Sequence, residues 1–215
     1  DVQLSDRLEI AVDRLEDVQF PMLGEHNVQN CLAAISICLE MAIDPAVILS
    51  GLRQFKGVGR RFDFKGETDG ITIIDDYGHH PVEIRAALSA GRMRAEQNKL
   101  IAVVQPHRYT RLRDLFSDFC ACFNDADHVI VSDVYAAGEA PIEGFERDDL
   151  VEGLRAWGHR SVHAMQDPSH LAAQINELAT SGDLVMCLGA GTVTQWASSL
   201  PQELALLRSA SPDKE

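Results

Sequence analysis

Five polar side chains occupy six consecutive positions directly after an apolar run in this chain. Residues 71–74 are β-branched, which favours a buried strand, and the sequence Asp-Asp-Tyr-Gly-His-His follows at 75–80. Pro81 then suits the first turn of a helix over residues 82–94. Open α/β sheets bind ligands outside the carboxyl ends of their strands, and core packing rarely requires so many polar groups together. The turn at 75–80 is therefore predicted to be a functional site.

A second apolar run, residues 100–104, ends in Gln-Pro-His-Arg-Tyr-Thr-Arg at 105–111. Arg108 and Arg111 are three positions apart, so they would converge on one anion if a helix starts here. The fork of an arginine guanidinium matches a carboxylate or a phosphate in two parallel hydrogen bonds. In an acidic chain such a cluster predicts an anionic small ligand, although salt bridges on the surface of the helix explain the same spacing equally well.

Two further loops follow predicted strands. The polar loop at 133–141 is expected on the same rim of the sheet as the first two turns, and three such loops together make a pocket. The segment Gly-Ala-Gly-Thr-Val-Thr at 189–194 begins like a dinucleotide fingerprint, but Thr194 stands where the third glycine or alanine belongs. Close packing of strand against helix, with an anion-binding turn as an option, is favoured over NAD or FAD binding.

The amino-terminal part offers a second group of candidates. His26 and Asn30 are four positions apart at the start of a predicted helix, so both face one side of its first turns. They could contact a nucleotide base or phosphate. A helix cap plus a surface histidine is the simpler interpretation, and the residue types alone favour it. Arg60 and Arg61 lie in a glycine-containing connecting segment, where they could grip a phosphate or be solvated charges.

Strand and helix patterns alternate along most of the chain, which predicts a doubly wound, mostly parallel α/β sheet. The expected strands are 62–65, 71–75, 100–104, 128–131, 161–164 and 184–188. The expected helices are 82–95, 111–123, 148–157, 169–180 and 192–198. Before them come two predicted helices, one beginning near residue 24 and one at 46–55, and two short alternating segments at 8–12 and 18–20 that could pair as strands.

Composition limits the classes of function. A net charge of −14 over 215 residues argues against a nucleic-acid or anionic-membrane surface, and no apolar run approaches the length of a membrane span. The five cysteines have no CxxC spacing, so buried reduced thiols are favoured over a metal cluster or disulfides. With no leader sequence visible, a cytoplasmic protein is expected.

Six segments of the chain, taken in order, resemble the Mur ligases, which are ATP-dependent amide-forming enzymes of bacterial cell-wall synthesis. The matching segments are 24–30, 59–62, 75–81, 105–109, 135–139 and 189–192. The resemblance implies that residues 1–57 are a remnant of a central ATPase domain and that residues 58–215 are a Rossmann-like carboxyl-terminal domain. It also implies that the UDP-sugar domain and most of the ATPase domain precede this chain in a longer enzyme.

The resemblance further implies a reaction and its residues. ATP phosphorylates the carboxylate of UDP-N-acetylmuramate, and the amine of L-alanine attacks the acyl phosphate. Nucleotide-binding residues would be His26, Asn30, Arg61 and Asp76. The L-alanine pocket would be lined by Tyr77, His79, His107, Arg108 and Arg111, with His79 and Arg108 as the catalytic residues.

ATP and Mg²⁺ are expected in the longer enzyme, with no metal ligands and no tightly bound cofactor in this chain. The isolated chain is expected to lack ligase activity, because the phosphate loop GxxxxGK[ST] is absent from it. The alternative is a stand-alone module of the same fold that binds a nucleotide or an amino acid without catalysis.

Overall fold

The computed structural model describes residues 15–210, and the chain divides into two compact units at residues 58 and 59. The first unit contains α1 (Glu25–Glu40) and α2 (Pro45–Gln54). As the sequence predicts, Pro45 opens α2, and the carboxylate of Asp44 caps it by accepting the N–H of Ala46 at 2.7 Å. A small cluster of Cys31, Ile35 and Ile48 joins the two helices.

The short strand expected at 18–20 is not formed, and this prediction was wrong. Residues 18–20 lie in irregular backbone next to α1 and α2. An alternating pattern makes a strand only where a neighbouring strand pairs its N–H and C=O groups, and none is present in the described part of this unit. The expected partner, residues 8–12, lies outside the described residues.

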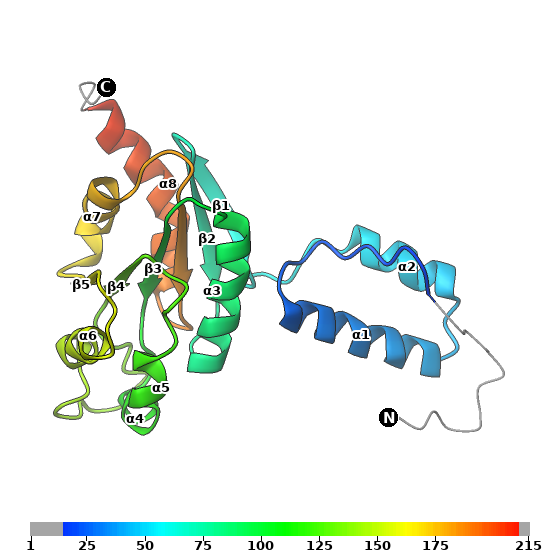
Figure 1. The fold of residues 1–215 in the computed structure, drawn as a ribbon, viewed down its shortest axis with the longest axis horizontal. Helices are drawn as coiled ribbons and strands as arrows, with labels where there is room; N and C mark the ends of the chain where they lie inside the picture. Colours follow the sequence, from blue (N-terminus) through cyan, green and yellow to red (C-terminus); the bar gives the residue numbers. More distant parts are fainter. Residues whose placement is uncertain (1–14, 211–215) are drawn as a thin grey trace. The chain divides into compact units, whose positions relative to one another are not determined.

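The second unit is a six-stranded sheet with helices on both faces (Figure 1). Its strands are β1 (Asp63–Thr68), β2 (Ile71–Asp76), β3 (Leu100–Val104), β4 (His128–Val131), β5 (Val162–Ala164) and β6 (Leu184–Leu188). Its helices are α3 (Pro81–Ala95), α4 (Tyr109–Asp114), α5 (Phe116–Cys120), α6 (Arg147–Ala156), α7 (Leu171–Leu178) and α8 (Val193–Ser209), with a 3₁₀ turn at Pro168–His170. The order β1-β2-β6-β3-β4-β5 is parallel except for β1 against β2. The predicted doubly wound α/β class is confirmed.

Two hydrophobic clusters make the layers. One face of the sheet packs against α3, α4, α5 and α6 through residues such as Ile84, Leu112 and Leu150. The other face packs against α7 and α8 through residues such as Ile175 and Leu200. Because both faces are covered, the central strands are continuous apolar runs, and every residue of β3 and β6 is buried.

The last helix is longer than predicted, since α8 continues through Pro201 to Ser209 instead of ending near residue 198. Proline removes one helical N–H and usually disrupts a helix interior. Here Pro201 packs beside Gly66 of β1, and its carbonyl accepts the hydroxyl of Thr68 at 2.7 Å. Leu204, one turn further on, is fully buried against the sheet. Tertiary packing on both sides of the proline therefore supports the helix.

The single helix predicted over 111–123 is two short ones, α4 and α5. Leu115 between them has φ −119° and ψ 22°, which is outside helical geometry. The apolar spacing is nevertheless preserved, since Leu112 and Phe119 both reach the core. All five cysteines are free, and all but the partly exposed Cys38 are buried, as the sequence predicts. No helix among residues 15–210 is both long and apolar enough to cross a membrane.

Candidate functional site on the carboxyl rim of the sheet

The turns after β2 and β3 are separated by one strand only. In the register of the sheet, Asp76 at the end of β2 lies opposite Leu188 of β6, and Leu188 lies opposite Val104 at the end of β3. The three strands are parallel, so their carboxyl ends share one edge. The predicted meeting of the polar turns at 75–80 and 105–111 is confirmed.

A row of four rings crosses this edge and joins three loops. The rings are Tyr77, His79, His107 and Tyr135, called here the ring row. Tyr77 meets His79 edge-on with centroids 5.1 Å apart, and His79 lies 5.7 Å from His107. His107 stacks on Tyr135 at 5.3 Å, and the two residues also form an isolated parallel bridge. The loop after β4 therefore belongs to the same rim, as its position after a predicted strand indicated.

Two arginines stand at the Tyr77 end of the ring row. The guanidinium carbons of Arg60 and Arg61 lie 4.8 and 5.6 Å from the centre of the Tyr77 ring, within the range of cation–π attraction. Arg60 also donates to the carbonyl of Gly189 at 2.7 Å, and its own carbonyl accepts the Tyr77 N–H at 2.7 Å. Arg60 is thus tied to the sheet, while the Arg61 side chain keeps 42% of its surface exposed. Arg61 is the arginine that can meet a ligand.

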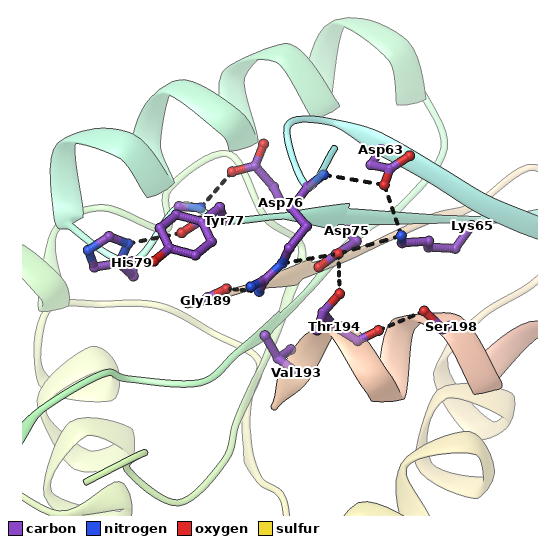
Figure 2. Close-up of polar contacts among 12 residues, drawn as sticks. Asp63, Lys65, Asp75, Asp76, Tyr77, His79, Gly189, Val193, Thr194 and Ser198 are labelled. Carbon is purple, nitrogen blue, oxygen red and sulfur yellow. Dashed lines mark hydrogen bonds and ion pairs between the residues drawn. The ribbon is translucent and has the colours of Figure 1, made fainter. Parts of the chain in front are cut away.

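Asp76 fixes the backbone on both sides of this cationic end (Figure 2). One carboxylate oxygen accepts the Gly78 N–H at 2.7 Å and the other accepts the Phe62 N–H at 2.9 Å. Asp76 is buried, and it therefore holds the turn after β2 against the residue that follows Arg61. This arrangement gives Asp76 a positioning function whether or not it also contacts a nucleotide.

Asp75 lies fully buried beneath the turn, and the sequence analysis did not assign it a role (Figure 2). Its carboxylate accepts the Thr194 hydroxyl at 2.6 Å and lies 3.5 Å from Nε of Arg60 and 3.8 Å from Nζ of Lys65. Lys65 also donates to Asp63 at 2.8 Å, and that hydrogen bond lowers the pKa of the Asp63 carboxyl. Paired cations and a hydroxyl donor make this buried carboxylate tolerable.

The glycine segment after β6 is closely packed, in agreement with the sequence analysis. The amide oxygen of Gln105 accepts the Val193 N–H at 3.1 Å, and its amide nitrogen donates to Thr192 at 2.9 Å. A Cβ on Gly191 would lie 2.7 Å from the Tyr135 ring. Glycine is needed at position 191 because the loop after β4 approaches the segment closely. The first N–H of α8, that of Val193, already donates to Gln105.

The hydrogen bonds of His79 determine which of its ring nitrogens carries the proton. Nδ1 lies 3.0 Å from the carbonyl of Tyr77 and 3.4 Å from a carboxylate oxygen of Glu83. Both neighbours only accept hydrogen bonds, so Nδ1 is the protonated nitrogen. Nε2 of the neutral ring is consequently an acceptor. A histidine in this state can take a proton from a bound ligand.

His107 lies next to Arg111, whose Nη1 is 3.2 Å from the imidazole Nδ1 and donates to the His107 carbonyl at 3.0 Å. Burial, together with the charge of Arg111, lowers the pKa of His107. His107 is therefore neutral at pH 7, and the positive charge at this point of the rim belongs to Arg111.

Arg108 and Arg111 have different partners, so the structure does not bring them onto a common one. Arg108 contacts Glu139 at 3.3 Å, and Glu139 also accepts the N–H and hydroxyl of Thr110 at 3.0 and 2.7 Å. The Thr110 hydrogen bonds lower the pKa of Glu139, which keeps it ionised. The Arg108 backbone has φ 73°, an unusual value for a residue with a side chain, and its N–H is held by the Tyr135 carbonyl at 2.9 Å.

His26 and Asn30 belong to the first unit, where they lie one turn apart near the start of α1. Asn30 is exposed and His26 half-buried. The N-cap of α1 is Gly24, so Asn30 is not the helix cap that its residue type favoured. In the described residues no group of three histidine, cysteine, aspartate or glutamate side chains could hold a metal ion.

The sequence analysis missed three side chains that build this site. Tyr135 extends the ring row, Glu139 holds Arg108, and Glu83 contacts His79. Tyr135 and Glu139 lay inside a segment already singled out for its polar residues. Glu83 stands three positions after His80 at a helix start, which is the spacing of a capping box and a signal that was available.

Comparison with known proteins identifies the family that this chain resembles. The family described as "Mur ligase, glutamate ligase domain" matches residues 60–191. The UDP-N-acetylmuramate–L-alanine ligase of Gluconobacter oxydans is 62% identical over 189 residues, which cover 88% of this chain and 39% of that protein. The protein of the same name from Granulibacter bethesdensis is 56% identical over 211 residues, covering 98% and 44%.

A solved structure is similar as well. The UDP-N-acetylmuramate–alanine ligase of Thermotoga maritima has a TM-score of 0.72 and 25% identity, with 89% of this chain and 40% of that chain covered. The chain spans about two fifths of the length of the curated relatives it matches. Because the family pattern covers more than half of its residues, the chain belongs to the Mur ligase family.

Proposed function

We propose that this chain is the carboxyl-terminal part of an ATP-dependent ligase that joins L-alanine to UDP-N-acetylmuramate through an acyl phosphate, in cytoplasmic peptidoglycan precursor synthesis. The observation that carries the proposal is the ring row, with Arg61 over its Tyr77 end, Arg111 beside His107, and Arg108 paired with Glu139 on the neighbouring loop. Relatives that are 62% and 56% identical carry that activity in their names, which supports it further.

The amino-acid site is assigned to the middle of the ring row. L-Alanine carries a carboxylate and an amine, and the rim offers a guanidinium and an acceptor nitrogen for them. Arg111 is placed by His107 and would bind the carboxylate. Nε2 of His79 would accept a proton from the ammonium group, and the resulting neutral amine would attack the acyl phosphate. Tyr77 and the stacked His107 would form the walls of the pocket.

Arg108 is assigned to the developing negative charge. Only one of its N–H groups contacts Glu139, at 3.3 Å, and its side chain is 47% exposed, so the remaining donors are available to a ligand. A guanidinium in this position stabilises an oxyanion or a leaving phosphate. The unusual backbone of Arg108 is consistent with this function, because strain concentrates at functional sites.

Nucleotide-binding roles are proposed for Arg61 and Asp76 in the second unit and, separately, for His26 and Asn30 in the first. ATP as a substrate supplies the phosphoryl group that activates the carboxylate. Arg61 suits a phosphate because its guanidinium is exposed. The main function of Asp76 is to hold the backbone next to Arg61, where it accepts the Phe62 N–H. The ligands of the Mg²⁺ that accompanies ATP are assigned to the part of the longer enzyme outside this chain.

The first unit is assigned to the end of a central ATP-binding domain. Its described residues expose large apolar side chains that a larger domain would cover, among them Val28, Leu32, Ile37, Met41 and Val47. The described part of this unit, two helices around three buried core residues, is also too small for independent stability. A stand-alone binding module remains the second candidate function, favoured by the complete core of the second unit.

The decisive experiment measures phosphate release with ATP, UDP-N-acetylmuramate and L-alanine. This chain alone is expected to give no alanine-dependent turnover, and the longer enzyme that contains it is expected to be active. No turnover by the longer enzyme would refute the proposal. Binding of ATP or L-alanine by this chain alone, with micromolar affinity and without turnover in any form, would favour the binding module instead.

A further inference from the structure

We propose that Glu83 is a positioning residue for His79, whose carboxylate holds the imidazole in the orientation that keeps the proton on Nδ1 and leaves Nε2 as an acceptor. The consequence for catalysis rests on the function proposed above. The consequence for the imidazole itself does not, because it follows from the contacts within this chain.

One carboxylate oxygen of Glu83 contacts both the backbone and the ring at the His79 turn. Oε2 accepts the backbone N–H of His79 at 3.1 Å and that of His80 at 3.3 Å. The same oxygen lies 3.4 Å from Nδ1 of the His79 ring. Backbone and ring of one residue are thus fixed by a single anionic atom.

The ionised state of Glu83 is favoured by this arrangement. Partial burial opposes ionisation, but the hydrogen bond from the His79 N–H and the nearby positive charges outweigh it and hold the pKa of the Glu83 carboxyl below its ordinary value. A carboxylate next to a histidine Nδ1–H fixes the tautomer and stabilises the ring when Nε2 gains a proton. The chemistry of the pair therefore suits a group that accepts a proton at Nε2.

Glu83 also connects two parts of the rim. Its second oxygen, Oε1, lies 3.8 Å from Nη2 of Arg61, the exposed arginine assigned to the nucleotide. Both of these side chains are partly solvated, so the ion pair itself contributes little stability. Its importance is geometric, since the carboxylate that orients His79 faces the arginine on the other side of Tyr77.

A purely structural function for Glu83 makes a different prediction. Glu83 is the third residue of α3 and part of a capping box with His80. If it only capped the helix, its removal would lower stability by about 1 kcal/mol and leave the His79 ring unchanged. Asp149 provides the matched control, because it is the third residue of α6 and accepts the N–H of Glu146 at 2.8 Å in a second capping box.

The first experiment detects the imidazole protons of this chain by two-bond ¹H–¹⁵N correlation at about pH 8, where an ordinary imidazole is neutral. The His79 signals are assigned by their loss in His79→Gln. The unsubstituted chain is expected to show His79 protonated on Nδ1. Glu83→Gln retains an oxygen for the cap but loses the charge. We expect it to shift the tautomer ratio toward Nε2–H by about tenfold, equal to about 1.4 kcal/mol.

The Glu83→Ala chain should show a larger shift of the ratio, and Asp149→Ala should show none. A His79 proton on Nε2 in the unsubstituted chain would overturn the proposal. An identical tautomer ratio in Glu83→Gln and the unsubstituted chain would overturn it as well. Glu83→Gln decides the question if Glu83→Ala does not fold.

The second experiment measures steady-state kinetics of the longer ligase. Glu83→Gln is expected to lower kcat at least tenfold while the KM for ATP changes less than about threefold, because a displaced base slows the chemical step more than it weakens binding. Asp149→Ala should leave both constants unchanged. Unchanged kcat in Glu83→Gln would refute the positioning function, whereas an inactive unsubstituted ligase would refute the proposed function and leave the tautomer result intact.

Discussion

The imidazole rings of His79 and His107 lie 5.7 Å apart although they come from different strand-end turns, and this proximity defines the site. It arises because β2 and β3 both pair with β6 in parallel, which aligns their carboxyl ends. Polar residues that the chain separates widely are thereby collected around one edge of the sheet.

Substitution of Arg108 or Arg111 should impair the reaction more than substitution of their neighbour Arg113. In the longer ligase, Arg111→Ala is expected to raise the KM for L-alanine, since the loss of a charged contact costs on the order of 2–4 kcal/mol. Arg108→Ala should reduce kcat by a comparable free energy. Arg113→Ala is the control, because the hydrogen-bonding partner of Arg113 is the exposed Asp114. Steady-state kinetics would check this, and equal effects at all three positions would contradict it.

The stability of the chain should fall as the solution is acidified below about pH 6.5, the ordinary value for histidine. Burial lowers the pKa values of His107, His128 and His163 in the folded state. The unfolded chain therefore binds protons first, and the free energy of unfolding decreases as pH falls from 6.5 toward the folded pKa values. Urea denaturation at pH 7.5 and at about pH 5.5 measures this.

Replacing one of these histidines tests whether it causes the fall in the free energy of unfolding at low pH. His163 accepts or donates to Ser161 at 2.9 Å, and His128 contacts the same hydroxyl at 2.6 Å. His163→Gln can still hydrogen-bond to Ser161 but does not titrate, so it should reduce the loss of stability between the two pH values. An unchanged loss would show that His163 does not contribute to it.

The glycine at 191 should not accept a side chain. Gly191→Ala would bring Cβ within 2.7 Å of the Tyr135 ring and is expected to destabilise the chain by about 1–3 kcal/mol through overpacking. At Gly59 a Cβ would meet nothing within 4 Å, so Gly59→Ala is the matched control. Thermal unfolding would compare them, and similar midpoints for both variants would contradict the packing described here.

The buried Asp75 should depend on its hydroxyl partner. Thr194→Val keeps the shape of the side chain but removes the 2.6 Å hydrogen bond, and it is expected to cost about 1–3 kcal/mol. Ser198→Ala, one turn along α8, removes an exposed hydroxyl that donates to the Thr194 carbonyl and should change stability by less than about 0.5 kcal/mol (Figure 2). Chemical denaturation of both variants distinguishes the two contacts.

The local sequence was informative where a segment's own side chains decide its structure. The strands at 100–104, 128–131 and 184–188 have the bounds that their residue patterns predict. Pro45 and Pro81 open the helices that their fixed φ predicts. The prediction that the last helix ends at residue 198 was wrong, because contacts with β1 outweigh the local effect of Pro201.

The candidate site divides in the same way. The sequence by itself determined which turns are polar and that these turns carry imidazoles and arginines. It also determined that several of them follow strands of one sheet. Residue types and apolar periodicity are local properties, so the sequence alone was sufficient for these conclusions. Only the tertiary structure decided that β6 lies between β2 and β3 and that Tyr135 stacks on His107. It also decided that Arg108 pairs with Glu139 and, within the described part of the chain, shares no partner with Arg111. These relationships depend on strand pairing and loop packing between segments far apart in the chain. The free energy of such contacts comes from burial and pairing of both partners together, which neither segment encodes alone.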